Sequence, residues 1–297
     1  MHVSIIGAGL IGGSLGLALK KTNWRAAFIN CFVRNSEIGE IAKNIGAVDN
    51  FEINLVKAVQ KADIVIIATP VLTIRDIFVE IAPVVKSGCI ITDTASTKLQ
   101  VLNWAEELLP DRVHFIGGHP MAGKEMSGIQ SADDTLFKKA IYCLVRSIKS
   151  TAQSISIIED MVANIGAKFI FMNAKEHDNI VAGISHLPLL VSSALTSVTT
   201  KSSYWDKLSV LASSGYYDTT RLASGKPELH GDIVTTNRES IIRWLDSYIE
   251  ELQGLRSVIN THDDNIYKYF VSANVARGKW LKEYHLRKSG HLGDFLG

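Results

Sequence analysis

The sequence predicts an α/β protein with an N-terminal doubly wound parallel sheet and a C-terminal all-helical domain. Two observations predict it. The first half alternates short apolar, β-branched runs with helical stretches, and the second half has helical spacing of apolar residues over more than a hundred positions. At 297 residues the chain exceeds the usual size of a single core, so we expect two domains, residues 1–150 and 151–297.

The strands of the first half are predicted by apolar runs that lack strict alternation. Such runs suit strands covered on both faces, as in a mostly parallel sheet with helices on each side. They lie at residues 2–7, 26–33, 62–70, 89–96, 113–118 and 140–146, and one more run follows at 167–172. Ligands of such a sheet bind at the carboxyl ends of the strands, so functional residues are expected directly after these runs.

Helices dominate the second half. Apolar residues recur at i, i+3, i+4 and i+7 over residues 177–200, 204–214 and 237–261. Pro188 lies inside one of these patterns and predicts a kink or a helix start, because an interior proline costs about 3 kcal/mol. In the last pattern one stripe suits either a core or a subunit interface, and it contains Trp244, Tyr248, Leu252 and Leu255.

Composition excludes several classes of function. With 31 basic and 30 acidic side chains the net charge is +1, which argues against a nucleic-acid or membrane-surface partner. The three cysteines, Cys31, Cys89 and Cys143, are widely spaced and predict neither disulfides nor a metal site. The apolar runs look shorter than a membrane span and no leader precedes the first strand, so we expect a complete, cytoplasmic protein.

The stretch "GAGLIGG" follows the first strand and opens a helix. Gly7 permits the tight turn, Gly9 lets a pyrophosphate approach the backbone, and Gly12 lets the helix pack on the strand. A bare tight turn is the alternative. Because the motif lies between a strand and a helix, it predicts a dinucleotide-binding Rossmann domain, in which Leu10 and Ile11 also contact the cofactor.

The end of the second strand bears on the choice of cofactor. NAD-selective sites usually place an acidic residue about 20 positions beyond the glycines. Here Arg34, Asn35 and Ser36 occupy this place, and they suit a 2′-phosphate. NADP is therefore favoured and NAD stays possible, since Arg34 could point into solvent while Glu37 binds the ribose.

Two further stretches end strands at the ligand edge. "ATP", with Thr69 and Pro70, offers small residues beside which a cofactor can lie. "DTASTK" supplies a carboxylate, a hydroxyl and an ammonium within six residues, from Asp93 to Lys98. For Asp93 and Ser96 the alternative is capping of the helix that begins near Lys98.

The stretch "GGHPMAG" holds His119 between Gly118 and Pro120 after another strand. The glycines on both sides allow backbone conformations that are closed to other residues, and Pro120 stiffens the turn. An imidazole fixed beside a nicotinamide would accept a proton from an alcohol during hydride loss, because it titrates near neutral pH. A lone histidine is more often structural or simply exposed.

The helical half contributes further polar residues. "AGISHLP" places His186 in an apolar helix, and "EHD" adds His177 and Asp178. Residues 213–229 lack periodicity and predict a loop in which Arg221 clamps an anion, since arginine binds carboxylates in a bidentate manner. An ordinary surface salt bridge is the alternative for Arg221.

These motifs together resemble the prephenate and arogenate dehydrogenases of tyrosine biosynthesis, the TyrA family. "GAGLIGGSL", "DTASTK", "GGHPMAGKEMSG", "EHDNIVAGISHLP" and "GYYDTTRLASGKPEL" occur in the family's order and approximate spacing over residues 1–240. The resemblance implies an oxidative decarboxylation, in which NAD(P)+ takes a hydride while CO2 leaves and a phenol forms. It also implies a homodimer made by the helical half.

The resemblance also implies roles for individual residues. His119 would accept the proton of the ring hydroxyl, and Ser96 would orient His119 or that hydroxyl. Arg221 would clamp the ring carboxylate, and His186 would lie near the nicotinamide. Lys124 and Glu125 would lie at the mouth of the pocket.

Two departures from the family pattern favour L-arogenate over prephenate. Prephenate-using members commonly carry a second histidine in "SHLPH" and a tryptophan after the "TR" motif, whereas this chain has Leu189 and, in "PELHGD", His230. The alternatives are a β-hydroxyacid or imine-reducing dehydrogenase, for which Lys175 would be the catalytic lysine, and a regulator that senses NADP(H) without turnover.

Overall fold

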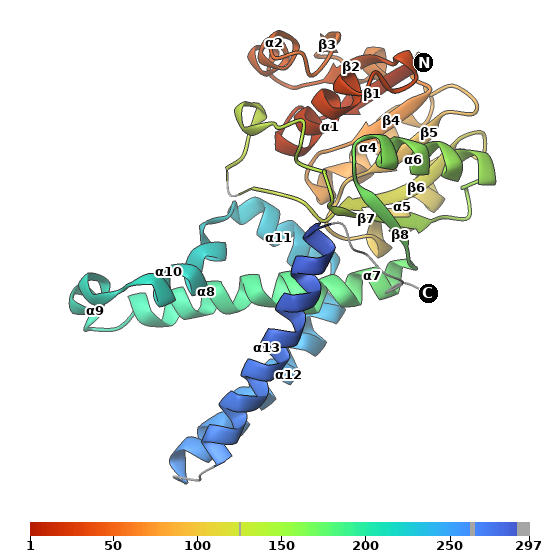
Figure 1. Ribbon diagram of the computed structural model, residues 1–297. Coiled ribbons are helices and arrows are strands. Elements are labelled where there is room, and N and C mark those ends of the chain that lie inside the picture. Colours follow the sequence, from red (N-terminus) through yellow and green to blue (C-terminus); the bar gives the residue numbers. More distant parts are fainter. Residues whose placement is uncertain (125, 262–264, 290–297) are drawn as a thin grey trace. The chain divides into compact units, whose positions relative to one another are not determined.

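The computed structural model describes residues 1–124, 126–261 and 265–289, with the side chains of 287–289 left aside (Figure 1). The chain divides into two compact units, Met1–Arg238 and Glu239–Gly297. The first unit contains the sheet and the residues expected to carry the chemistry. Within its described residues, the second unit is helical.

One sheet runs through the first unit. Its strands are β1 (His2–Ile6), β2 (Phe28–Phe32), β3 (Asn50–Glu52), β4 (Ile64–Ile67), β5 (Ile90–Asp93), β6 (His114–Pro120), β7 (Ile141–Arg146) and β8 (Lys168–Phe171). Their order is β3-β2-β1-β4-β5-β6-β7-β8, and every neighbouring pair is parallel except β6 and β7. The doubly wound sheet is thus confirmed, with its topological switch point between β1 and β4.

Helices cover both faces of the sheet. They are α1 (Leu10–Lys21), α2 (Ser36–Asn44), α3 (Leu55–Val59), α4 (Ile74–Ile81), α5 (Leu99–Leu108) and α6 (Ala152–Asn164), with short turns η1 (Trp24–Ala26), η2 (Val71–Thr73) and η3 (Ile129–Ser131). In β4, Ile64 and Ile66 join one apolar core, with α1 and α6, while Val65 and Ile67 join the other, with α4 and α5. Burial on both faces explains why the strand sequences show no alternation.

The sheet extends beyond residue 150. Strand β8 pairs in parallel with β7, and helix α6 forms the crossover between them. A parallel pair needs such a crossover, so α6 and β8 continue the sheet architecture into residues that we had grouped with the helical domain.

One long helical run follows the sheet. It consists of α7 (Ala174–Val181), the π-helical segment η4 (Ala182–His186) and α8 (Leu187–Thr200). Pro188 lies in the first turn of α8, in agreement with the predicted kink or helix start. The run spans 27 residues and is long and apolar enough to cross a membrane, unlike the short apolar runs that we expected. However, His177, Asp178 and His186 are buried on it against the rest of the first unit, as in a core helix.

The segment expected to be a loop, residues 213–229, is largely helical. After α9 (Trp205–Leu211) come α10 (Ser214–Thr220), η5 (Arg221–Ser224) and α11 (Pro227–Thr236). The loop prediction was wrong because each of the first two elements is two turns or shorter, which leaves no room for an apolar period. Both pack against α8, where the Tyr216 hydroxyl lies 2.8 Å from Thr199 Oγ1.

The second unit contains most of α12 (Arg238–Asn260) and all of α13 (Asn265–Ser289). Large apolar side chains on both helices are exposed in the single chain, among them Trp244, Ile249, Leu252, Phe270 and Trp280. Of the stripe predicted on α12, Trp244 is 40% exposed and Leu252 is 45% exposed, which favours an interface over a core for these two residues.

Candidate active site

The glycine loop forms a cradle at the amino end of α1. Gly7 has a φ of +99°, and a Cβ on Gly12 would lie 1.9 Å from the Gly7 carbonyl oxygen. A Cβ on Gly9, in contrast, would meet no atom within 4 Å. Gly9 is the N-cap of α1 and supplies no side-chain cap to the first amides of the helix. This arrangement fits the pyrophosphate of a dinucleotide.

The "ATP" stretch lies directly beside this loop. A Cβ on Gly7 would be 2.8 Å from the Ala68 carbonyl oxygen and 2.9 Å from the Thr69 methyl carbon. The Thr69 hydroxyl is held 2.8 Å from the hydroxyl of Thr73, and Pro70 is the N-cap of η2. Leu10 and Ile11 form the first turn of α1 and are half-buried.

Residues 34–37, which follow β2, are exposed. The side chain of Asn35 caps α2, because its Oδ1 accepts a hydrogen bond from the Glu37 amide at 2.8 Å. Arg34, Ser36 and Glu37 are all open to solvent. Asn35 therefore has a structural task that we had not assigned, and its amide nitrogen is the part of the side chain left for a ligand.

His119 lies near the carboxyl end of β6 and heads a chain of buried polar groups. Its Nδ1 is 2.9 Å from Nε2 of His177, and Nδ1 of His177 is 2.7 Å from Oδ1 of Asp178. His177 is completely buried and Asp178 is 2% exposed, whereas His119 is half-buried. The chain connects β6 with α7. The sequence signal for this chain of groups is "EHD", a His-Asp pair on the buried side of a helix, to which the sequence alone assigns no role.

Asp178 also caps α5. Its two carboxylate oxygens accept hydrogen bonds from the Lys98 amide at 2.8 Å and the Leu99 amide at 2.9 Å. Helix α5 has no side-chain cap from its own N-cap residue. The alternative prediction, that Asp93 or Ser96 caps this helix, was therefore wrong, because a residue 80 positions away satisfies the amides instead.

Asp93 supports the backbone beside His119. It forms a buried ion pair with Lys98, and its Oδ1 accepts a hydrogen bond from the Gly118 amide at 3.1 Å. Burial lowers the pKa of Lys98, while Asp93 opposes this effect. A Cβ on Gly118 would lie 2.5 Å from the Asp93 carbonyl oxygen. Close approach to the Asp93 backbone therefore requires glycine here, and the φ of Gly118 is not positive.

Burial and neighbouring charges keep His119 neutral. Burial lowers its pKa well below 6.5, and the nearby His177, Lys98 and His186 act in the same direction. His119 Nε2 makes no hydrogen bond within the described part of the chain, and it is not an enclosed atom. A neutral imidazole with one accessible nitrogen is suited to accept a proton.

His186 lies close to the same chain of groups. Its Nδ1 is 3.3 Å from the amide nitrogen of Asn237, which also donates to the Asp178 carbonyl oxygen at 2.7 Å. Burial lowers the pKa of His186 to about 4. Because Asn237 donates to Nδ1, the proton of the neutral ring lies on Nε2, an enclosed atom without a partner among the described residues.

The remaining predicted residues are not hydrogen-bonded to His119 in the described structure. Ser96 is half-buried in the loop between β5 and α5. Lys124 donates a hydrogen bond to Asp133 at 2.8 Å, so its ammonium ties the loop after β6 together. Glu125 lies outside the described residues.

Arg221 is exposed and begins η5. This turn is fastened to α8, since the Ala223 amide donates to Ser192 Oγ at 3.0 Å. Ser192 follows His186 by six residues, which is about 9 Å along a helix axis. Helix α11 then reaches the cofactor edge of the sheet, where Thr236 Oγ1 is 2.9 Å from Thr97 Oγ1 and Asp232 accepts from the Leu72 amide at 3.3 Å.

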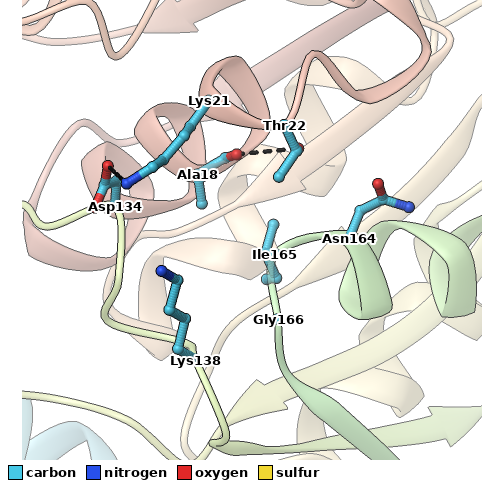
Figure 2. A pocket seen from close by; sticks show the side chains of 8 residues that line it. All are labelled: Ala18, Lys21, Thr22, Asp134, Lys138, Asn164, Ile165 and Gly166. Carbon is cyan, nitrogen blue, oxygen red and sulfur yellow. Dashed lines mark hydrogen bonds and ion pairs between the residues drawn. The ribbon is translucent and has the colours of Figure 1, made fainter.

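A separate pocket of about 200 Å³ lies at the carboxyl end of α1 (Figure 2). Its rim carries an ion pair between Lys21 and Asp134 at 2.5 Å, and Lys138 and Asn164 also line it. The glycine loop is at the opposite, amino end of α1, so this pocket does not belong to the dinucleotide cradle.

The fold and the site define a class of protein, the dehydrogenases that use a nicotinamide dinucleotide. A glycine cradle lies at the switch point of a doubly wound sheet, and a neutral histidine lies on the same edge.

Comparison with known proteins identifies the family. Residues 15–171 match the family model for the prephenate dehydrogenase nucleotide-binding domain, and residues 173–272 match the model for the prephenate dehydrogenase dimerization domain. The chain belongs to the prephenate dehydrogenase family. It is a prephenate/arogenate dehydrogenase, an NAD(P)-dependent oxidoreductase of tyrosine biosynthesis.

Individual relatives agree with this assignment. Prephenate dehydrogenase of Bacillus subtilis is 33% identical over 93% of this chain and 75% of its own length. The crystal structure of Synechocystis arogenate dehydrogenase matches with a TM-score of 0.80 and 30% identity, over 94% of this chain and 100% of that one. Prephenate dehydrogenase from Aquifex aeolicus, in complex with hydroxyphenyl propionate and NAD+, matches with a TM-score of 0.88 and 25% identity, over 94% and 98%. The hydroxyacid or imine dehydrogenase and the non-catalytic regulator are thereby set aside.

Proposed function

We propose that the protein is an NADP+-dependent arogenate dehydrogenase that acts as a cytoplasmic homodimer. The observation that carries the proposal is His119, which is neutral and half-buried and lies on the sheet edge that holds the glycine cradle. The dimerization-domain match and the exposed apolar residues of α12 and α13 support the dimer.

In the proposed reaction His119 serves as the base. The bound dinucleotide supplies the hydride acceptor. As the ring carbon loses its hydride, His119 Nε2 accepts the hydroxyl proton. The bond between the ring and its carboxylate then breaks, CO2 leaves, and the electron pair completes the aromatic ring. His119 returns the proton to the phenolate oxygen, so atoms and charges balance without a net proton.

The other predicted residues bind and orient the substrate. Arg221 holds the ring carboxylate, and its turn is anchored on α8 a few residues beyond His186. Arg221 has to bind the ring carboxylate with moderate strength, because tight binding of the ground state slows the loss of CO2. Ser96 orients the hydroxyl, His186 lies by the nicotinamide, and Lys124 borders the entrance.

Arg34 supports NADP+ over NAD+. It is exposed after β2, where an NAD-selective protein usually carries an acidic residue. The similar structure from Aquifex aeolicus contains NAD+, and its sequence is 25% identical to that of this chain. We expect Arg34→Ala to raise the KM for NADP+ by on the order of 10-fold and to leave the KM for NAD+ nearly unchanged, because a guanidinium recognises only the extra phosphate. Steady-state kinetics with both cofactors measures this.

Glu37→Gln is the matched control for this prediction. If Glu37 binds the ribose instead, this variant would weaken NAD+ binding while Arg34→Ala would affect both cofactors equally. That pair of results would contradict the NADP+ assignment.

Leu189 and His230 support L-arogenate as the substrate. Leu189 is 8% exposed, so a residue without hydrogen-bonding groups occupies the place of the family's second histidine. His230 packs against Gly225 and is half-buried. A site that lacks a polar partner for one side chain discriminates against it.

The proposal is tested by incubating the protein with NADP+ and either L-arogenate or prephenate and following the absorbance of the reduced cofactor. We expect a higher kcat/KM with arogenate, by about 10-fold or more. A higher value with prephenate would overturn the substrate assignment.

A further inference from the structure

We propose that His177 and Asp178 are positioning residues that hold His119 in its Nδ1–H tautomer, so that the Nε2 lone pair accepts the substrate proton. The inference rests on the base role proposed above for His119. It assigns a task to two buried polar residues on α7 that the proposed reaction does not otherwise use.

The donor and acceptor of each hydrogen bond in this chain can be assigned, beginning with Asp178. Both of its oxygens accept bonds from backbone amides, those of Lys98 and Leu99, at the amino end of α5. Backbone amides can only donate, so both oxygens of Asp178 are acceptors, and a carboxylate has no hydrogen to donate. The His177 nitrogen at 2.7 Å from Oδ1, Nδ1, must therefore be the donor.

The same assignment determines which nitrogen of His119 carries the proton. A neutral imidazole that donates from Nδ1 has an acceptor lone pair at Nε2. His177 Nε2 is 2.9 Å from Nδ1 of His119, so His119 must donate from Nδ1. Its own lone pair is then at Nε2, the nitrogen that makes no hydrogen bond with described residues and is not enclosed.

His119 becomes a cation once it holds the substrate proton. Burial and the nearby His177, Lys98 and His186 disfavour that cation. The carboxylate of this chain belongs to Asp178, whose Oδ1 lies 2.7 Å from His177 Nδ1. The paired Asp93 offsets the charge of Lys98, and Cys143 faces His119 from β7.

Asp178 also caps α5, so variants of Asp178 would mix two effects, and the test uses His177. His177→Gln places an amide oxygen where Nε2 was, which still accepts from His119. His177→Leu has no acceptor. We expect His177→Leu to lower kcat by on the order of 10- to 1,000-fold and His177→Gln to stay within about 10-fold of the wild type. Thermal unfolding and cofactor titration report whether each variant folds.

A direct measurement accompanies the kinetics. In 15N NMR spectra of the wild-type enzyme, with the His119 signals assigned through His119→Asn, we expect the proton on Nδ1 and a bare Nε2. His177→Gln should keep this tautomer, and His177→Leu should lose it. A wild-type proton on Nε2 would overturn the proposal even if neither variant folds. Equal activity in both folded variants would also overturn it.

Failure of this inference and failure of the proposed function give different results. If His119→Asn turns over normally, the base role is wrong, whatever the tautomer. If His119→Asn is inactive while the wild type carries its proton on Nε2, only the positioning role is wrong.

Discussion

Replacement of His119 by asparagine is expected to lower kcat by about 100-fold to 10,000-fold and to leave dinucleotide binding nearly intact. Asparagine can still donate a hydrogen bond towards His177, so the buried chain of polar groups keeps its partner. What it lacks is a nitrogen lone pair that accepts a proton near neutral pH. Stopped-flow or steady-state kinetics, together with fluorescence titration of the cofactor, measures both quantities.

The pH profile provides the control for this prediction. Burial lowers the pKa of His119, and a base is active only when it is deprotonated. The kcat/KM of the wild type should therefore stay high as pH falls to 6.5 and decline only below it. The residual activity of His119→Asn should lack that acid limb. Near-normal turnover in the variant, or an unchanged limb, would show that another group is the base.

The second large effect is expected at Gly12. A methyl group there would lie 1.9 Å from the Gly7 carbonyl oxygen, which belongs to the backbone and cannot rotate away. We expect Gly12→Ala to lower the free energy of unfolding by roughly 1–3 kcal/mol or more, and to abolish measurable dinucleotide binding because the cradle must shift. Denaturant unfolding and cofactor titration measure these effects.

Gly9→Ala is the matched variant. Its Cβ would meet no protein atom within 4 Å, and the backbone of Gly9 is extended, so the free energy of unfolding should change by less than about 1 kcal/mol. The methyl group would still obstruct the phosphates, and the Kd of the dinucleotide should rise by about 10-fold or more. Unchanged cofactor binding in Gly9→Ala would mean that the pyrophosphate lies elsewhere.

The local sequence was sufficient to predict the location of residues that directly follow a strand. Gly7, Gly12 and His119 were predicted at one edge because the carboxyl ends of parallel strands meet there. The local sequence was insufficient to predict the short helices after α8. There the apolar spacing covers too few turns to be distinguished from a loop, so α10 and η5 were missed.

The sequence by itself therefore determined the α/β class, the cofactor cradle and the position of a histidine at the same edge of the sheet, because each depends on local periodicity or on a motif of fixed spacing. Only the tertiary structure decided what that histidine touches. His177 is 58 positions from His119, and Asp178 caps a helix that begins 79 positions earlier. Such contacts arise when separate elements pack together, and no periodicity within either element records them.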